Sequence, residues 1–269
     1  REDGSRNIGL PARRPEGVAA LPDGRFVVGT WDGQIYMLSE SLPALFGRGS
    51  GIVAGIRPDP ATGTLLACFT DEEGGRAVVQ RHRIADGAVV AMYPLPASRA
   101  FCNDIALTGD GFAVTESNGG RVYQLARGRL VPLPIEPLFY PNGIAADPAS
   151  GRLYIAHGSG ILVFDARAGR SAPLEVDGTL LGGIDGLAWH DGGLIAVQNV
   201  AVPARVLRIA PDSGGPAAVR LLLSGSALLQ GATTVAARGG AAFILSHTGI
   251  PTGAPPNDQI LIRVPLQGP

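Results

Sequence analysis

Four acidic or amide side chains each stand at the start of a short apolar run, and their types suit the binding of a metal ion. They are Glu16 in "PEGVA", Asn103 in "FCNDIA", Asn142 in "PNGIA" and Asp185 in "IDGLA". Carboxylate and amide oxygens are hard ligands, and Ca²⁺ accepts about six to eight of them in a loose shell, whereas Mg²⁺ demands stricter geometry. If the fold brings the four together, we expect a divalent-metal site.

Each of these residues also has a purely structural interpretation. Asn103 and Asn142 could bond their own backbones in Asx turns, and Asp185 could be an ordinary turn aspartate before a glycine. Glu16 could cap a turn after a proline. The metal site therefore depends on whether separate parts of the chain converge, which requires a repeated architecture.

Six similar segments supply that repeat. Each contains an apolar run, a turn with glycine and a second apolar run, as in "GVAALPDGRFVVGT" and "GIAADPASGRLYIAHG". The turn glycines recur every 39 to 48 residues, at positions 24, 63, 111, 151, 192 and 239. This interval matches one four-stranded blade of a β-propeller, at about 40 to 50 residues.

A third apolar run follows each hairpin, and a shorter fourth run follows the first five, for example "AVVAMYPL" and "RLVPLPI". We therefore expect an all-β, six-bladed β-propeller with four-stranded blades, forming a single domain over residues 1–269. The blades would start near residues 16, 53, 103, 142, 185 and 233. Two β-sandwiches would need a linker near the middle of the chain, and none is visible.

The sixth repeat reaches the C-terminus without a fourth strand. We expect "RNIGLP", residues 6–11, to pair with "QILIRVP" and so close the ring, which removes two exposed sheet edges. In such a ring the first strand of each blade lines the central channel. Glu16, Asn103, Asn142 and Asp185 would then converge at its mouth.

Composition limits the classes of partner. Apolar residues make up 45% of the chain and charged residues 17%, and the net charge of −1 gives no sign of nucleic-acid binding. No apolar run reaches the ~18 residues of a membrane span. We expect a soluble monomer that is secreted or periplasmic after signal removal, or else cytoplasmic.

For Cys68 and Cys102, two free buried thiols are expected, with one disulfide as the alternative.

The four motifs, in this order, resemble those of the six-bladed senescence-marker-protein (regucalcin)/gluconolactonase family. The resemblance implies that Glu16, Asn142 and Asp185 bind a metal ion, with Asn103 as a further ligand or a substrate contact. It also implies a metal-dependent hydrolase of lactones or esters, with metal-activated water as nucleophile and Asp185 as general base. Ca²⁺ is the expected ion, and Zn²⁺, Mn²⁺ and Mg²⁺ are alternatives.

Loops between second and third strands should rise on the same face as these residues, because the second strand returns to the mouth. The substrate contacts expected there are Trp31, Asp32, Glu116, His157, Asn199 and His247. His157 should share a face with Asn142. The two histidines could act as a base or shuttle, or simply hydrogen-bond between blades.

Phe101 stands two residues before Asn103, where sugar-lactone members of the family commonly carry arginine. A phenyl ring packs against apolar substrate and cannot donate to sugar hydroxyls, so a less polar lactone or ester is expected. Two other classes stay open. One is a non-hydrolytic binding module with a structural metal; the other is a biosynthetic propeller enzyme of non-hydrolytic chemistry.

Overall fold

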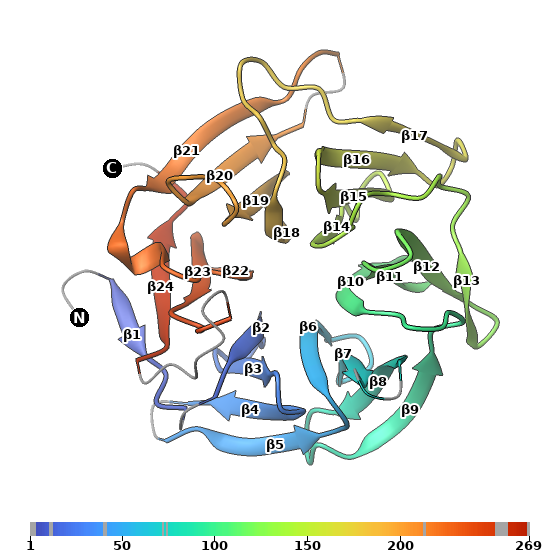
Figure 1. The fold of residues 1–269 in the computed structure, drawn as a ribbon, viewed down its shortest axis with the longest axis vertical. Helices are drawn as coiled ribbons and strands as arrows, with labels where there is room; N and C mark the ends of the chain where they lie inside the picture. The colour runs from blue at the N-terminus through green and yellow to red at the C-terminus, as the bar shows by residue number, and fades with distance from the viewer. Residues whose placement is uncertain are drawn as a thin grey trace.

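The computed structural model describes residues 4–10, 13–39, 42–71, 73, 75–211, 214–250 and 258–267, and it is a ring of β-sheets (Figure 1). Within these residues the strands form six four-stranded sheets, each paired antiparallel from the axis outward. The one short helix among them is the 3₁₀ helix η1 (Ala227–Leu229). The predicted all-β, six-bladed propeller is confirmed.

The first three blades follow the chain order from the axis to the rim. Blade 1 contains β2 (Pro15–Ala20), β3 (Phe26–Thr30), β4 (Gln34–Leu38) and β5 (Ala44–Arg48). Blade 2 contains β6 (Ile52–Asp59), β7 (Thr64–Asp71), β8 (Arg76–Arg83) and β9 (Val89–Pro94). Blade 3 contains β10 (Cys102–Thr108), β11 (Gly111–Glu116), β12 (Arg121–Ala126) and β13 (Arg129–Pro132).

The next three blades repeat this order, and the last is completed from the N-terminus. Blade 4 contains β14 (Ile144–Ala146), β15 (Arg152–His157), β16 (Gly160–Asp165) and β17 (Arg170–Pro173). Blade 5 contains β18 (Ile184–His190), β19 (Gly193–Gln198), β20 (Arg205–Ala210) and β21 (Ala218–Ser224). Blade 6 contains β22 (Val235–Arg238), β23 (Ala241–Ser246), β24 (Ile260–Pro265) and β1 (Ser5–Asn7).

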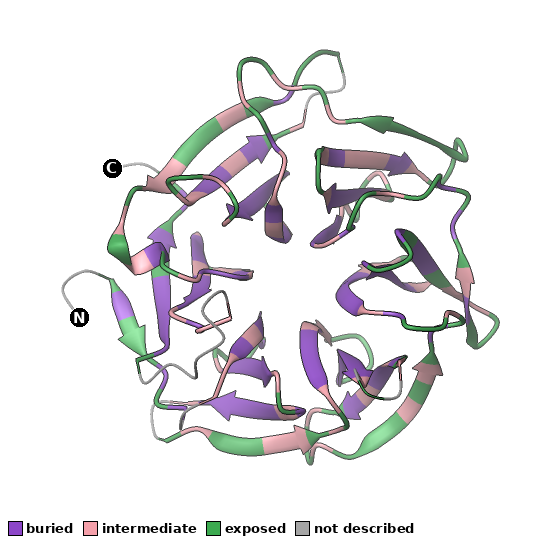
Figure 2. Ribbon diagram, in the orientation of Figure 1, coloured by how far each residue is buried: buried purple, intermediate pink, exposed green. Residues whose placement is uncertain are grey.

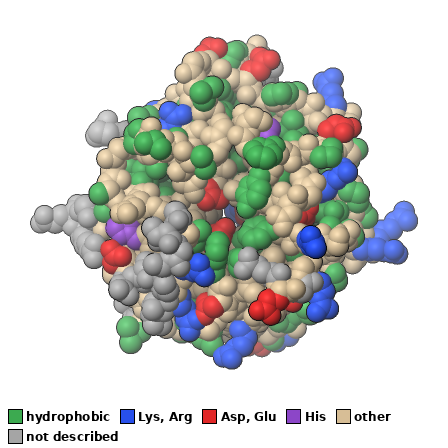
Figure 3. All heavy atoms as spheres, in the orientation of Figure 1, with side chains coloured by type: hydrophobic (Ala, Val, Ile, Leu, Met, Phe, Trp, Pro, Cys, Tyr) green, Lys and Arg blue, Asp and Glu red, His purple; other side chains and the backbone are tan. Residues whose placement is uncertain are grey.

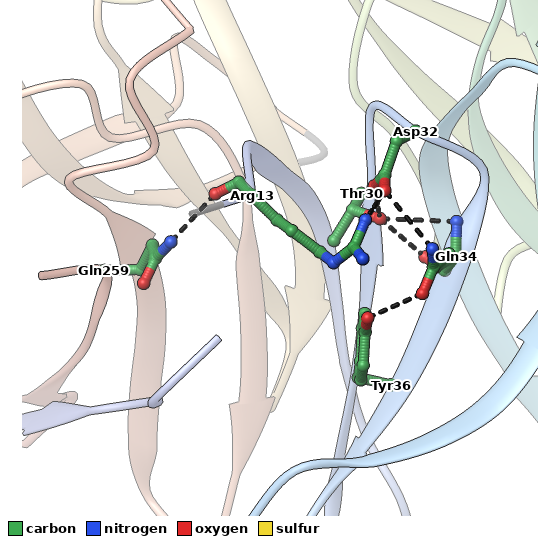
Figure 4. A network of polar contacts seen from close by, with 6 residues as sticks. All are labelled: Arg13, Thr30, Asp32, Gln34, Tyr36 and Gln259. Carbon is green, nitrogen blue, oxygen red and sulfur yellow. Dashed lines mark hydrogen bonds and ion pairs between the residues drawn. The ribbon is translucent and has the colours of Figure 1, made fainter. Parts of the chain in front are cut away.

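The N-terminal segment closes the ring on the last blade, as predicted, although the paired strand is Ser5–Asn7 and not residues 6–11. β1 pairs antiparallel with β24, with Ser5 opposite Ile262 and Asn7 opposite Ile260. A second link lies nearer the axis, where the Gln259 amide donates to the Arg13 carbonyl and the Arg13 guanidinium pairs with Asp32 (Figure 4). The chain ends are thus joined by backbone pairing and by a side-chain network.

The hydrophobic core is divided among the six blade interfaces. Each apolar cluster combines residues of two neighbouring blades, for example blades 2 and 3 around Phe112 or blades 5 and 6 around Ile244. Figure 2 shows the inner strands mostly buried and the outermost strands of most blades largely exposed or half-buried. The six predicted turn glycines all have positive φ, as their hairpins require.

The expectation of two free thiols is wrong. Cys68 on β7 and Cys102 on β10 form a disulfide, and both are fully buried. Their Cα atoms lie 5.3 Å apart, because these strands of blades 2 and 3 face each other across the shared core. A separation of 34 residues in sequence gives no sign of this contact.

Candidate active site

The mouth of the ring is the face on which the first strand of each blade begins and the second ends. Four first strands carry a pairing irregularity there, between Pro15 and Val18, Val53 and Ile56, Cys102 and Ile105, and Ile184 and Gly186. A β-bulge re-aims side chains out of the regular alternation. The residues inside these four irregularities include Glu16, Asn103, Asp104 and Asp185.

The bulged residues surround a cavity of about 10 Å³ at the axis. It is lined by Glu16, Gly17, Ala54, Gly55, Asp104, Asp185 and Thr234. This volume is close to that of one water molecule or one ion. Figure 3 shows acidic side chains at the centre of this face.

Glycines let the inner strands approach one another around this cavity. A methyl group on Gly17 would lie 1.9 Å from the Ala54 carbonyl oxygen, and one on Gly143 would lie 2.5 Å from the Asp185 carbonyl oxygen. Neither glycine has positive φ. The glycines that follow Glu16 and Asn142 are therefore needed for close packing between blades rather than for a turn.

Asp185 is held by two amide side chains. Asn199 Nδ2 donates to Asp185 Oδ2 at 2.5 Å and to the Ala232 carbonyl at 2.9 Å, and the Asn142 side chain donates to Asp185 as well. Burial raises the pKa of Asp185 to about 7, against the opposing effect of these two hydrogen bonds. The negative charge of Asp104 adds to the rise.

Glu16 faces the same cavity from blade 1. Burial raises its pKa to about 8, and the negative charges of Asp185 and Asp104 contribute further. The Trp31 indole donates to Glu16 Oε2, and the Arg14 guanidinium lies 4.7 Å from the centroid of the Trp31 ring. The predicted loop residue Trp31 therefore orients a carboxylate of the site.

Asn142 and Asn103 differ in their surroundings. The backbone N–H of Asn142 donates to the Ala156 carbonyl at 2.8 Å. His157 follows Ala156 in the chain, so Asn142 and His157 lie on the same face of the ring, as predicted. Asn103 is buried, and its Nδ2 donates to Ser117 Oγ at 2.9 Å. This anchors its amide nitrogen and leaves its carbonyl oxygen as the atom that could face a ligand.

Asp104 is an acidic residue of the site that the sequence interpretation missed. Its Oδ1 and Oδ2 accept from the backbone N–H groups of Ile105 and Ile144, and Arg57 Nη2 lies 3.8 Å from Oδ1. Burial raises its pKa, while Arg57 and the two backbone donors oppose the rise. The signal was the Asn-Asp pair of "FCNDIA", in which only the asparagine was chosen.

Glu116 does not lie free at the surface as a substrate contact would. Its side chain is fully buried and accepts from the backbone N–H groups of Phe101, Asn118 and Gly119 at 2.8 to 3.1 Å. Through these bonds Glu116 holds the loop between β11 and β12 in place. Phe101, whose backbone Glu116 binds, is half-buried beside the bulge of blade 3.

The remaining predicted contacts lie away from the acid pair. Asp32 is engaged by Arg13 and Thr30 in the network of Figure 4. His247 Nδ1 lies 3.1 Å from Asp258 Oδ2 and its Nε2 lies 3.2 Å from the Ala227 carbonyl, which ties it to blade 6. His157 is half-buried, its Nδ1 lies 3.2 Å from Ser159 Oγ, and burial lowers its pKa.

Tyr140 is a second residue that the sequence interpretation missed. It has a positive φ of 53°, which is uncommon for a residue with a side chain. Burial raises the pKa of its phenol, and the charges of Glu16 and Asp185 raise it further. Three residues later the Gly143 N–H donates to the Asp185 carbonyl at 2.9 Å, which brings this loop to the strand that carries Asp185. Its neighbour Pro141 accepts a hydrogen bond from Ser117.

The donor chemistry of the cavity fits a hard cation. Three carboxylates line a space of ionic size, and the charges of Asp185 and Asp104 disfavour ionisation of Glu16, which a bound cation would relieve. In the described part of the chain, however, no three His, Cys, Asp or Glu side chains are placed as a ready metal-binding group.

Comparisons with known proteins place the fold. No protein-family model and no curated protein matches the chain. A gluconolactonase from Xanthomonas campestris superposes with a TM-score of 0.69 at 20% identity, over 97% of this chain and 89% of that one. The aldose sugar dehydrogenase of Streptomyces coelicolor, in a PQQ-bound form, gives 0.69 at 18% identity over 97% and 96%.

A third structure, an oxidoreductase (glucose dehydrogenase) from Thermus thermophilus, gives 0.67 at 19% identity over 97% and 99%. These likenesses establish the propeller fold. Their activities differ, so the chemistry of this ring has to be argued from its own residues. None of the helices in the described residues is long and apolar enough to cross a membrane.

Proposed function

We propose that this protein is a hydrolase of the lactonase or esterase type, with its reaction centre at the Glu16–Asp185 pair. Asp185 carries the proposal. It is a buried carboxylate, oriented by Asn199 and Asn142, and in the absence of a cation its pKa is raised to about 7. A carboxylate held in a fixed orientation can accept the proton of an attacking water and pass it to a leaving group.

The ion proposed for this centre is Ca²⁺, held by Glu16, Asn142 and Asp185, with Asn103 as a further ligand. Zn²⁺, Mn²⁺ and Mg²⁺ are the alternatives. A divalent ion there would polarise the substrate carbonyl and stabilise the negative charge that develops on its oxygen. The oxygen donors around the axial cavity support the proposal.

The chain's own residues divide the remaining work. Asn199 and Asn142 hold the Asp185 carboxylate so that one oxygen can take the proton of an attacking water. Trp31 fixes the second carboxylate, Glu16, at the opposite side of the cavity. Asp104 is bound to two backbone N–H groups, and we assign it to the negative field of the cavity rather than to proton transfer.

The likeness to a gluconolactonase supports hydrolysis, and the likeness to sugar dehydrogenases supports an oxidoreductase equally well. The residues of the axial cavity favour the first. Three carboxylate side chains line it, which suits a divalent ion and an attacking water, and the Arg57 guanidinium at its edge is already paired with Asp104.

Replacing Asp185 by Asn tests the proposal. Purified wild type and Asp185→Asn are assayed with a panel of lactones and aryl esters, with and without Ca²⁺ after treatment with chelator. We expect turnover by the wild type and a loss of at least about 10³-fold in the variant, since a proton acceptor is removed. Equal turnover by both proteins would show that Asp185 is not the general base.

The same panel separates the alternatives. Turnover that persists after complete removal of metal would exclude the ion while leaving Asp185 in place. Binding without turnover, equal in wild type and Asp185→Asn, would make the ring a binding module instead of an enzyme.

A further inference from the structure

Exposed apolar side chains gather on the mouth beside the acid pair. The loop before β14 exposes Phe139 and Tyr140, the loop before β18 exposes Leu180, and the loop between β19 and β20 exposes Val200 and Val202. We call these five residues the apolar rim. Leu180 is 85% exposed and Val202 99%. Such a concentration on one face of a water-exposed surface usually marks a binding site.

The rim is built on packed loops from blades 4 and 5. A methyl group on Gly158 would lie 2.2 Å from the Phe139 ring, and one on Gly183 would lie 2.6 Å from Val200 Cβ. The Leu180 carbonyl accepts from Gln198 Nε2 at 3.0 Å and from Arg205 Nη2 at 2.9 Å. The apolar side chains are therefore presented by loops that are held in place.

Tyr140 joins the rim to the reaction centre. Its neighbour Phe139 is 79% exposed and Tyr140 itself is 48% exposed, and three residues after Tyr140 the Gly143 N–H donates to the Asp185 carbonyl at 2.9 Å. The left-handed backbone of Tyr140 costs about 1 kcal/mol or more, and such strain is concentrated at functional sites. The segment from Phe139 to Gly143 thus leads from the apolar rim to the strand that carries Asp185.

Two of the loops on this side are almost wholly apolar in sequence. Residues 200–204 read Val-Ala-Val-Pro-Ala, and residues 137–141 read Pro-Leu-Phe-Tyr-Pro. Asn199 bonds Asp185 and Ala232. A polyhydroxylated substrate would find few partners for its hydroxyls here, whereas an alkyl or aryl group would bury apolar surface.

We propose that the apolar rim binds the hydrophobic acyl or aryl part of the substrate, so that the enzyme acts on medium-chain or aromatic esters and lactones rather than on sugar lactones. The placement of the carbonyl at Glu16 and Asp185 rests on the proposed function. The binding of the apolar group rests on the rim alone.

A series of p-nitrophenyl esters from acetyl to decanoyl tests the proposal by turnover. We expect kcat/KM to rise with each methylene that the rim buries, by up to about 4-fold per group, and gluconolactone to be a poor substrate. The double variant Leu180→Ser/Val200→Ser should reduce the decanoyl-to-acetyl ratio of kcat/KM at least about 10-fold. Leu221→Ser, an exposed apolar residue on the outer strand β21, is the matched control and should leave the ratio unchanged.

Direct binding separates this inference from the proposed function. The probe is 2-nonanone, a neutral ketone with no bond to hydrolyse, titrated against the wild type and the double variant by NMR. Binding that the double variant weakens at least about 5-fold supports the rim even if no ester is turned over, in which case only the proposed function fails. Ester hydrolysis with no dependence on chain length, or equal 2-nonanone binding by both proteins, would overturn the inference.

Discussion

Asn199 Nδ2 lies 2.5 Å from Asp185 Oδ2 and also donates to the Ala232 carbonyl, so one amide ties the proposed base of blade 5 to the start of blade 6. The two residues are 14 positions apart in sequence, one near the start of β18 and the other just after the end of β19, so they meet at the open end of this hairpin. The register of the hairpin therefore sets the contact between the proposed base and the amide that orients it.

Replacing Asn199 by Ala removes a hydrogen bond to a charged group, worth about 1.5 to 3 kcal/mol. We expect kcat/KM to fall roughly 10- to 150-fold, with most of the loss in kcat because the substrate-binding rim is intact. Steady-state kinetics on an ester that the wild type hydrolyses measures the change. An unchanged kcat would show that Asn199 does not orient the base.

Metal binding predicts a stabilisation that does not depend on turnover. Ca²⁺ at about 100 times its dissociation constant should add about 2.7 kcal/mol to the free energy of unfolding. Thermal unfolding of chelator-treated protein, with and without Ca²⁺, would show it. The shift should be lost in Glu16→Gln/Asp185→Asn, and the same shift in both proteins would place the ion elsewhere.

Gly143 is predicted to tolerate no side chain. An added methyl group would meet the Asp185 carbonyl oxygen at 2.5 Å and Leu187 N at 2.6 Å. Overpacking of this kind costs about 1 to 3 kcal/mol, which urea denaturation of Gly143→Ala would measure. Gly160→Ala, in the same blade with nothing within 4 Å, is the control and should be nearly neutral. Similar stabilities for the two variants would contradict the close-packing argument.

The disulfide closes a loop of 34 residues between blades 2 and 3. In the chain-entropy description this stabilises the fold by about 3 to 4 kcal/mol, which Cys68→Ala/Cys102→Ala should lose in denaturant unfolding. We propose that the protein works in an oxidising compartment, where such bonds persist. Alkylation of freshly isolated protein, unfolded in denaturant without reductant, should label neither cysteine, and two labelled thiols would refute this.

His82 gives the fold a defined pH dependence. It is fully buried, its Nδ1 lies 3.0 Å from the Gly87 carbonyl, and burial lowers its pKa below the usual value of ~6.5. Because the unfolded chain binds the proton more readily, its contribution to stability is present above ~6.5 and is lost as the pH falls below it. Wild type should therefore lose more stability than His82→Gln between about pH 7 and 5. Parallel losses, measured by urea unfolding at each pH, would exclude His82.

The repeat, the blade count and the closing strand can all be predicted from the amino-acid pattern. Six hairpins with glycine turns, each followed by a third strand, can bury their apolar faces only against one another, and this forces a ring. The pattern also placed Glu16, Asn142 and Asp185 on one face, because the first strand of every blade begins there. These features depend on local pattern and on period.

Which side chains meet depends on the packing of the folded ring. Asp104 lies in the bulge of β10 and lines the axial cavity. Glu116 is buried because its carboxylate accepts hydrogen bonds from backbone N–H groups, among them those of Phe101 and Gly119. The Cys68–Cys102 bond and the position of Tyr140 beside the acid pair likewise come from packing between neighbouring blades. Such contacts join residues far apart in the chain, so no local pattern in the sequence encodes them.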